Sequence, residues 1–169
     1  MVRYADIMSD SIVDGPGIRV VAFLQGCPRI CEGCHNPSLL PIEGGIEVTE
    51  NELAKMLLKK LTAKHAGLSF SGGDPLMQPE ALYKVISFIR NRRPDVNIWL
   101  YSGYTFEEVK DLPVMSLIDV LVDGPFILKE KDISLVFKGS RNQRIIDVPN
   151  SLATGQIAEI LTKKYAANI

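Results

Sequence analysis

Residues 18–37, IRVVAFLQGCPRICEGCHNP, hold the features that decide the fold. The first seven residues form an almost unbroken apolar run, which is typical of a strand buried on both faces of a parallel sheet. A glycine and three cysteines, Cys27, Cys31 and Cys34, follow within ten residues of that run. The segment therefore predicts a buried strand whose carboxyl end opens into a cysteine-rich loop.

The order of strand, loop and helix recurs along the chain. Further strands are expected at 3–7, 68–71, 97–101, 118–122 and 144–148, and helices at 49–61, 79–90 and 105–113. Such alternation favours parallel strands joined by right-handed crossovers. The chain has 169 residues, whereas a complete eight-unit barrel needs about 250. We therefore expect an α/β fold of mainly parallel strands, either an incomplete (β/α) barrel or an open sheet.

Two helix starts carry a capping-box pattern, in which a Thr is followed three residues later by a Glu. Thr49 with Glu52 is the first, and Thr105 with Glu108 the second. We expect one domain over 1–169, with a core from about residue 4 to 148. Residues 150–169 form a tail that we expect to be helical.

Polar and glycine-rich residues follow the expected strands at their carboxyl ends. They are the cysteine loop, Ser71-Gly72-Gly73-Asp74, Ser102-Gly103 and Asp123-Gly124. The carboxyl ends of parallel strands meet at one edge of a sheet or barrel, where active sites form. We therefore expect these four loops to make one site.

Composition excludes several classes of protein. Lys and Arg number 19 and Asp and Glu 20, so the net charge is −1 and no basic excess indicates a nucleic-acid or anionic-membrane partner. No apolar run approaches the 18–20 residues, roughly, that span a bilayer. Residues 1–10 contain two Asp and lack the apolar stretch of a signal peptide. We expect a cytoplasmic protein.

The cysteines call for a chemical explanation. Three thiols within eight residues cannot form a disulfide framework, and the cytosol keeps thiols reduced. Their spacing, Cys-x3-Cys-x2-Cys, suits an iron–sulfur cluster in which one iron keeps an open position for a ligand. The alternative is a zinc site completed by His35. That residue directly follows Cys34, which is awkward for shared chelation of one tetrahedral ion.

Residues 26–37 and 14–19 resemble the cluster loop of radical S-adenosylmethionine (SAM) enzymes and the segment before it in their glycyl-radical activating branch. Residues 71–76, SGGDPL, resemble the GGE-type motif of these enzymes. Residues 101–104, 122–126 and 138–144 resemble later motifs of one group, the activating proteins of anaerobic (class III) ribonucleoside-triphosphate reductases. The resemblance runs in order from about residue 4 to 148.

This resemblance implies an incomplete barrel of the radical SAM type. It also implies a 4Fe–4S cluster held by Cys27, Cys31 and Cys34, with SAM on the fourth iron. The residues implied in SAM binding are Gly33, Cys34, His35, Gly72, Gly73 and Asp74. An external one-electron donor, flavodoxin-like or similar, reduces the cluster, and cleavage of SAM gives a 5′-deoxyadenosyl radical. That radical takes a hydrogen atom from a glycine of the reductase large subunit.

Two residues depart from the family pattern. Gly33 stands where an aromatic residue is preferred, and Asp74 stands where Glu is more general. Another short radical SAM enzyme acting on a small molecule, as in deazapurine biosynthesis, is one alternative function, and a zinc-binding interaction module is another. Asp123 fits either a turn or capping role or a role near SAM. Three basic residues fit either a solvated face or a docking surface: Lys138, Arg141 and Arg144.

Overall fold

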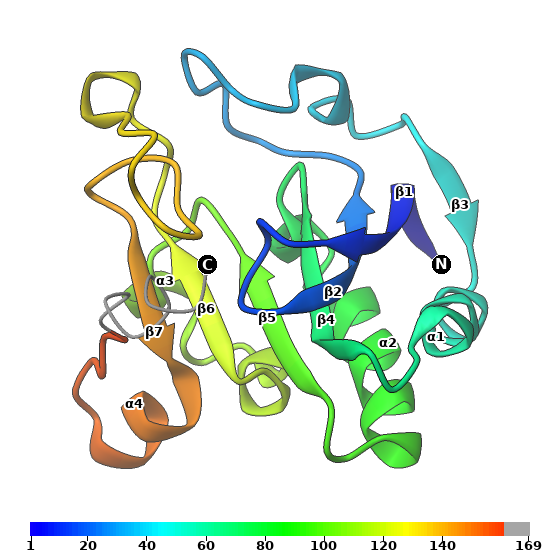
Figure 1. Ribbon diagram of the computed structural model, residues 1–169. Coiled ribbons are helices and arrows are strands. Elements are labelled where there is room, and N and C mark those ends of the chain that lie inside the picture. The colour runs from blue at the N-terminus through cyan, green and yellow to red at the C-terminus, as the bar shows by residue number, and fades with distance from the viewer. Residues whose placement is uncertain (161–169) are drawn as a thin grey trace.

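The computed structural model describes residues 1–160, which contain one seven-stranded sheet with the strand order β3-β1-β2-β4-β5-β6-β7 (Figure 1). The strands are β1 (Val2–Ser11), β2 (Ile18–Leu24), β3 (Ile46–Val48), β4 (His65–Gly72), β5 (Asn97–Tyr101), β6 (Val120–Asp123) and β7 (Arg144–Asp147). The buried run at 18–24 is therefore a strand, as predicted, and it lies inside the sheet between β1 and β4.

The sheet is parallel in its centre and antiparallel at its flanks. β2, β4, β5 and β6 pair in parallel, whereas β1 pairs antiparallel with β2 and β3, and β7 antiparallel with β6. The short turn at residues 12–17 permits only an antiparallel pair, because a parallel pair needs a long crossover. The fold is thus α/β with a mixed sheet, and the expectation of mainly parallel strands holds for its centre.

Three helices lie between strands, as the sequence predicts, and a fourth follows the last strand. They are α1 (Glu50–Lys60), α2 (Pro79–Arg92), α3 (Phe106–Val109) and α4 (Val148–Thr154), with short 3-10 turns at Pro37–Leu39, Pro75–Met77, Pro113–Leu117 and Leu128–Glu130. Both predicted capping boxes form, before α1 and before α3. None of the helices within residues 1–160 is long and apolar enough to cross a membrane.

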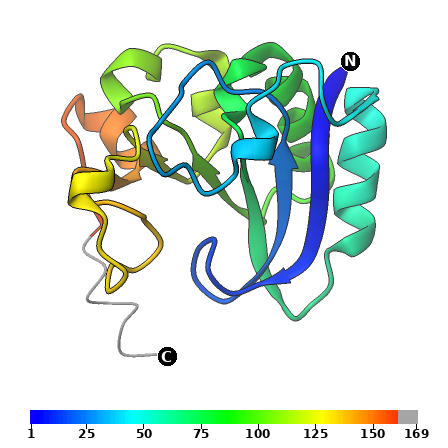
Figure 2. The ribbon, with the colours of Figure 1, turned by 90° about the horizontal axis from the view of Figure 1, so that it is seen from above.

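The main hydrophobic core lies between the sheet and helices α1 and α2, which cover one side of the sheet (Figure 2). Leu53 and Leu57 of α1 and Val85 and Ile89 of α2 are fully buried there. A smaller cluster, centred on Trp99, lies on β5, β6 and β7. The other side of the sheet is thereby left for the loops that follow the strands.

Two parts of the chain differ from the sequence-based expectations. β3 was not predicted, because two of its three residues are exposed and show no apolar run. The expected helix over 150–169 is wrong for residues 155–160. Helix α4 ends where the N–H of Gly155 caps it by donating to Ser151 O, and the chain then pairs with β7 through Ile160 N and Ile145 O. Residues 161–169 lie outside the described part of the chain.

Candidate functional site

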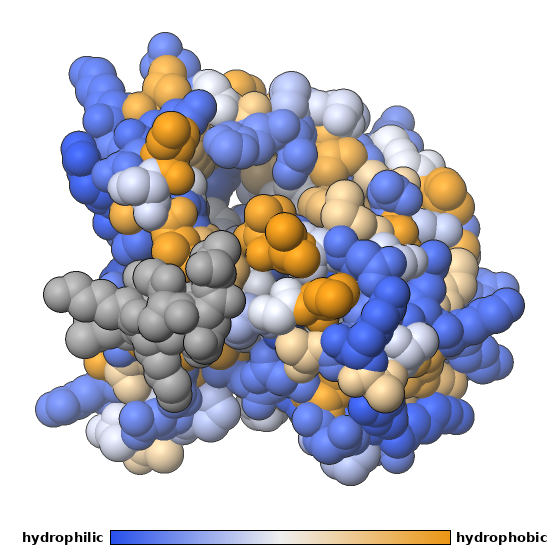
Figure 3. Space-filling model, viewed as in Figure 1, coloured by the Kyte–Doolittle hydropathy of each residue, from blue (hydrophilic) through white to orange (hydrophobic). Residues whose placement is uncertain are grey.

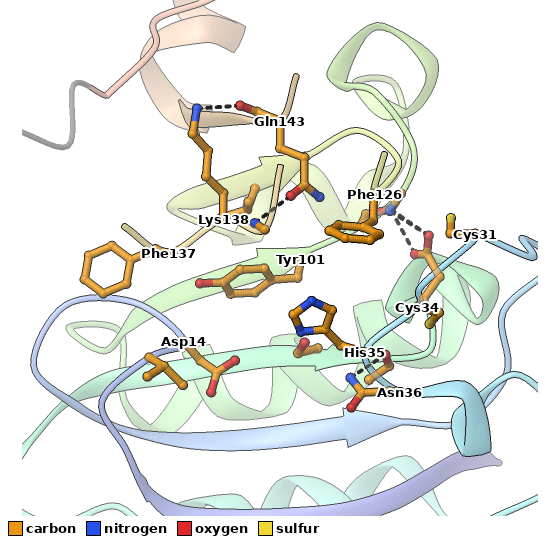
Figure 4. Close-up of a pocket in the computed structure, with 18 of the residues that line it drawn as sticks. Asp14, Cys31, Cys34, His35, Asn36, Tyr101, Phe126, Phe137, Lys138 and Gln143 are labelled. Atoms are coloured by element: carbon orange, nitrogen blue, oxygen red, sulfur yellow. Dashed lines mark hydrogen bonds between the residues drawn. The ribbon is translucent and has the colours of Figure 1, made fainter. Parts of the chain in front are cut away.

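A cavity of about 790 Å³ opens at the carboxyl ends of the parallel strands (Figure 4). Its lining includes residues from the cysteine loop, 71–74, 102–103 and the segment after β6. The sequence-predicted site residues in this lining are Cys27, Cys31, Cys34, His35, Gly72, Gly73 and Asp74. Gly33 and Asp123 are absent from the lining. The structure thus brings the predicted loops together at one cavity.

Backbone hydrogen bonds join the two ends of the cysteine loop. Gly26 N donates to Leu39 O at 2.9 Å and Cys27 N to Leu40 O at 3.1 Å, and within the loop Cys34 N donates to Cys31 O at 3.1 Å. All three cysteines are free thiols and half-buried. Burial and the nearby Asp74 raise the pKa of the Cys27 thiol. The loop therefore holds three accessible thiols at one end of the cavity.

The three thiols lie on one short loop that borders the cavity. A cubane distributes its thiolates over separate irons, so three thiols along one loop suit an iron–sulfur cluster. A tetrahedral zinc site would need a fourth ligand beside them.

Gly73 lies against the base of the cysteine loop. A Cβ atom at this position would be 2.3 Å from Gly26 O and 2.7 Å from Leu39 O, both backbone atoms. Backbone hydrogen bonds hold the turn against the same region: Gly73 N donates to Leu24 O at 2.9 Å and Asp74 N to Gly26 O at 2.8 Å. The glycine is therefore required by the contact between two protein loops, before any ligand is considered.

Replacing Gly73 by Ala is accordingly expected to displace the cysteine loop and to lower the iron bound per chain several-fold. The clash is with backbone, which cannot swing aside as a flexible side chain would. Iron and sulfide analysis after anaerobic reconstitution measures the effect. Full iron content combined with weak SAM binding would contradict this role and would make Gly73 a contact of the ligand alone.

Asp74 is buried, and its carboxylate is already engaged by the protein. One oxygen accepts from Leu76 N at 3.0 Å and Ser102 Oγ at 2.9 Å, and the other accepts from Gly103 N at 2.9 Å. Burial raises the pKa of Asp74, and these three donors oppose that rise. A carboxylate offers about four acceptor positions. Asp74 therefore connects the turn after β4 to the turn after β5 and has little remaining capacity for a ligand.

The backbone conformation and the packing around residue 33 explain why it is a glycine rather than an aromatic residue. Gly33 has a φ of 73°, and a Cβ there would be 2.9 Å from Leu128 Cδ1. The neighbouring His35 ring instead meets the Phe126 ring edge-on, with centroids 5.3 Å apart. Phe126, which follows β6, thus supplies an aromatic side chain to the cavity close to the cysteine loop (Figure 4).

Asp123 and Arg144 form a structural ion pair, which favours the capping interpretation of Asp123. Its carboxylate accepts from Phe106 N at 2.7 Å, at the start of α3, and from Arg144 Nε at 3.1 Å. Arg144 also donates to Glu107 at 2.7 and 3.1 Å, and both carboxylates raise its pKa. Arg144 is therefore engaged within the chain rather than free on a solvated face, whereas 62% of the Arg141 side chain is exposed. A docking role for this segment stays a prediction.

Two polar side chains in the cavity lining were missed at the sequence level. The Arg29 guanidinium lies over the Tyr104 ring, 4.4 Å from its centroid, and its Nε is buried without a hydrogen-bond partner among residues 1–160. The hydroxyl of Tyr101 is likewise buried without a partner in that range. Spacing gives no signal for either residue, because each depends on loops that meet only in the folded chain.

Comparisons with known proteins agree with this site. Residues 13–146 match the family model described as a 4Fe-4S single cluster domain. The anaerobic ribonucleoside-triphosphate reductase-activating protein of Vibrio cholerae is 40% identical over 141 residues, covering 79% of this chain and 90% of its own. Proteins of that name from Enterobacteria phage T4 and Escherichia coli are 35% and 38% identical, covering 85% and 78% of this chain and 92% and 90% of their own.

Proposed function

We propose, because this chain belongs to the family of anaerobic ribonucleoside-triphosphate reductase-activating proteins, that it generates a glycyl radical on the large subunit of such a reductase. The chain is then a radical SAM activating enzyme with a 4Fe–4S cluster. The observation that supports this most strongly is the cavity itself. Three free thiols, a double-glycine turn and the ends of four parallel strands border the same space.

Cys27, Cys31 and Cys34 would hold the cluster, and residues 33–35 and 72–74 would border SAM. When bound, the cluster and SAM supply the one-electron chemistry that removes a hydrogen atom from glycine. Three thiolates for four irons leave one iron open to the amine and carboxylate of SAM. The protein's part is to position these groups and to exclude water and oxygen around them.

The backbone of the glycine turn has a defined role in this proposal. The N–H groups of Gly73 and Asp74 already donate to Leu24 O and Gly26 O, and Gly72 O accepts from Asn36 Nδ2 at 3.4 Å, so the groups of the turn that could still meet a ligand are carbonyl oxygens. Carbonyls accept hydrogen bonds, and the amine of SAM is a donor. The turn would thus orient the amine through its carbonyls, while the Asp74 carboxylate keeps the turn in place.

We further propose that the curved sheet is an incomplete (β/α) barrel of the radical SAM type and that the chain is one domain. The helices on one side of the sheet and the cavity at the strand ends support this arrangement (Figure 2). An external one-electron donor is required, and no nucleic-acid or membrane partner is proposed. The proposed setting is the cytoplasm, where free thiols persist.

The test is anaerobic incubation of the reconstituted protein with SAM, a reductant and a class III reductase, read by electron paramagnetic resonance. The expected result is a glycyl-radical signal that requires all components. SAM cleavage without this signal, stimulated by a small molecule, would indicate the small-molecule alternative. One zinc per chain and no sulfide would instead indicate the zinc-binding interaction module.

A further inference from the structure

Tyr101 ends β5 and lines the cavity, and its hydroxyl faces the half that is farther from the cysteine loop. In Figure 4 the hydroxyl points away from the labelled cysteines and toward the side where Asp14 and Phe137 lie. The oxygen is buried and has no hydrogen-bond partner among residues 1–160. An unpaired buried hydroxyl costs about 1–3 kcal/mol, so its retention needs a reason beyond folding.

The lining of this half of the cavity is mainly apolar. Met8, Ile12 and Val13 border it from β1 and the turn that follows, and residues 133 and 135–137 border it from the segment after β6. Ile12 and Val13 are 71% and 70% exposed, and Figure 3 shows apolar surface beside a hollow in the same face of the molecule. A polypeptide entering here would lose the water that hydrates its backbone.

Two charged side chains at this end already have a partner within the chain. Asp14 accepts from Ser11 Oγ, and Lys138 Nζ donates to Gln143 O at 2.7 Å. Burial, with Asp14 adding to it, raises the pKa of Tyr101 well above its ordinary value. The phenol is therefore protonated at neutral pH and can donate a hydrogen bond.

We propose that the Tyr101 hydroxyl donates a hydrogen bond to a backbone carbonyl of the reductase segment that carries the target glycine. This inference rests on the proposed function and adds a contact that fixes the segment's backbone. The glycine must present its Cα–H bond in one orientation, and a positional error near 1 Å can cost about 100-fold in rate. Since glycine has no side chain to grip, its flanking carbonyls are the groups available for this purpose.

The test replaces Tyr101 by Phe, which removes only the oxygen atom. The reductase concentration that gives half-maximal glycyl-radical formation is expected to rise about three- to tenfold. This is the change in affinity that corresponds to one neutral hydrogen bond. The number of 5′-deoxyadenosine molecules produced per glycyl radical is expected to rise as well, because a poorly held segment is missed more often. Tyr83→Phe, on the outer surface of α2 and 39% exposed, is the matched control and is expected to behave as wild type.

Thermal unfolding of the apoprotein separates a positioning role from a structural one. Because the hydroxyl has no partner within residues 1–160, Tyr101→Phe is expected to unfold at the same temperature as wild type or higher. This inference is overturned if Tyr101→Phe has the same radical yield and the same half-maximal reductase concentration as wild type. It is also overturned if the variant unfolds at a lower temperature that accounts for its loss of radical formation. If the wild-type protein forms no glycyl radical at all, the proposed function itself fails, and the two failures are thereby distinguished.

Discussion

Replacing Cys27, Cys31 or Cys34 by Ala, one at a time, is expected to abolish the bound cluster and to reduce glycyl-radical formation to background. These are the only three cysteines in the chain, so no other thiolate can take the lost position. A cluster held by two thiolates would have two irons without protein ligands. Iron and sulfide per chain, close to about four of each in the reconstituted wild type, measure the loss directly.

The fold is expected to persist in these three variants. The cysteines are only half-buried, and the core between the sheet and helices α1 and α2 contains none of them. The free energy of unfolding of the apoprotein should change by less than about 1 kcal/mol. Ile30→Ala, in the same loop and 92% exposed, is the control and should retain its iron. A complete, active cluster in any one cysteine variant would refute the ligand set.

Asp123→Ala is expected to lower the free energy of unfolding by about 2–3 kcal/mol, the largest effect on stability proposed for a single side chain in this protein. The variant loses the acceptor for Phe106 N at the start of α3 and leaves Arg144 without its buried partner. Removing one member of a fully buried ion pair generally lowers the free energy of unfolding by more than this. The Arg144 side chain is 28% exposed, so hydration reduces the cost here. Denaturant unfolding of the apoprotein measures the difference.

Glu107→Gln is the matched comparison, because Glu107 binds the same guanidinium from the surface. Its side chain is 56% exposed, and exposed ion pairs contribute about 0–1 kcal/mol. The Asp123 variant should therefore be destabilised clearly more than the Glu107 variant. Equal effects would show that the Asp123 contact is no stronger than an ordinary surface pair.

Local patterns in the sequence predicted the parts of the fold that depend on local interactions. The capping boxes at Thr49 and Thr105 form because each requires only residues within one helical turn. The loops after β2, β4 and β5 were placed at one edge because parallel pairing brings carboxyl ends together. The cysteine spacing predicted an iron–sulfur protein, in agreement with the family match, because the three cysteines proposed as ligands lie in one loop.

Features that depend on partners distant in the chain could not be predicted. Arg144 looks like a surface cation in the sequence, yet Asp123 lies opposite it across the β6–β7 pair. Asp74 is proposed to border SAM, and its carboxylate also accepts hydrogen bonds from Ser102 and Gly103, about 28 residues away, which no local pattern indicates. β3 has no apolar pattern and exists because the edge of β1 is available for pairing. Each outcome is decided by tertiary contact rather than by local propensity.

The hydrogen bonds around Asp74 join one part of the cavity wall together and leave another part outside this network. The turn after β4 is hydrogen-bonded to the base of the cysteine loop and to the turn after β5, so these three segments are cross-linked to one another. Within residues 1–160, by contrast, the hydrogen bonds of residues 131–139 stay inside the segment 127–143. The Phe137 ring also packs edge-on against Trp99, with centroids 5.5 Å apart. Segments with few hydrogen bonds to the rest of a protein open at a lower free energy than cross-linked ones. We therefore expect residues 131–139 to yield when the proposed reductase segment enters the cavity, while the cross-linked turns keep the cysteine loop in place.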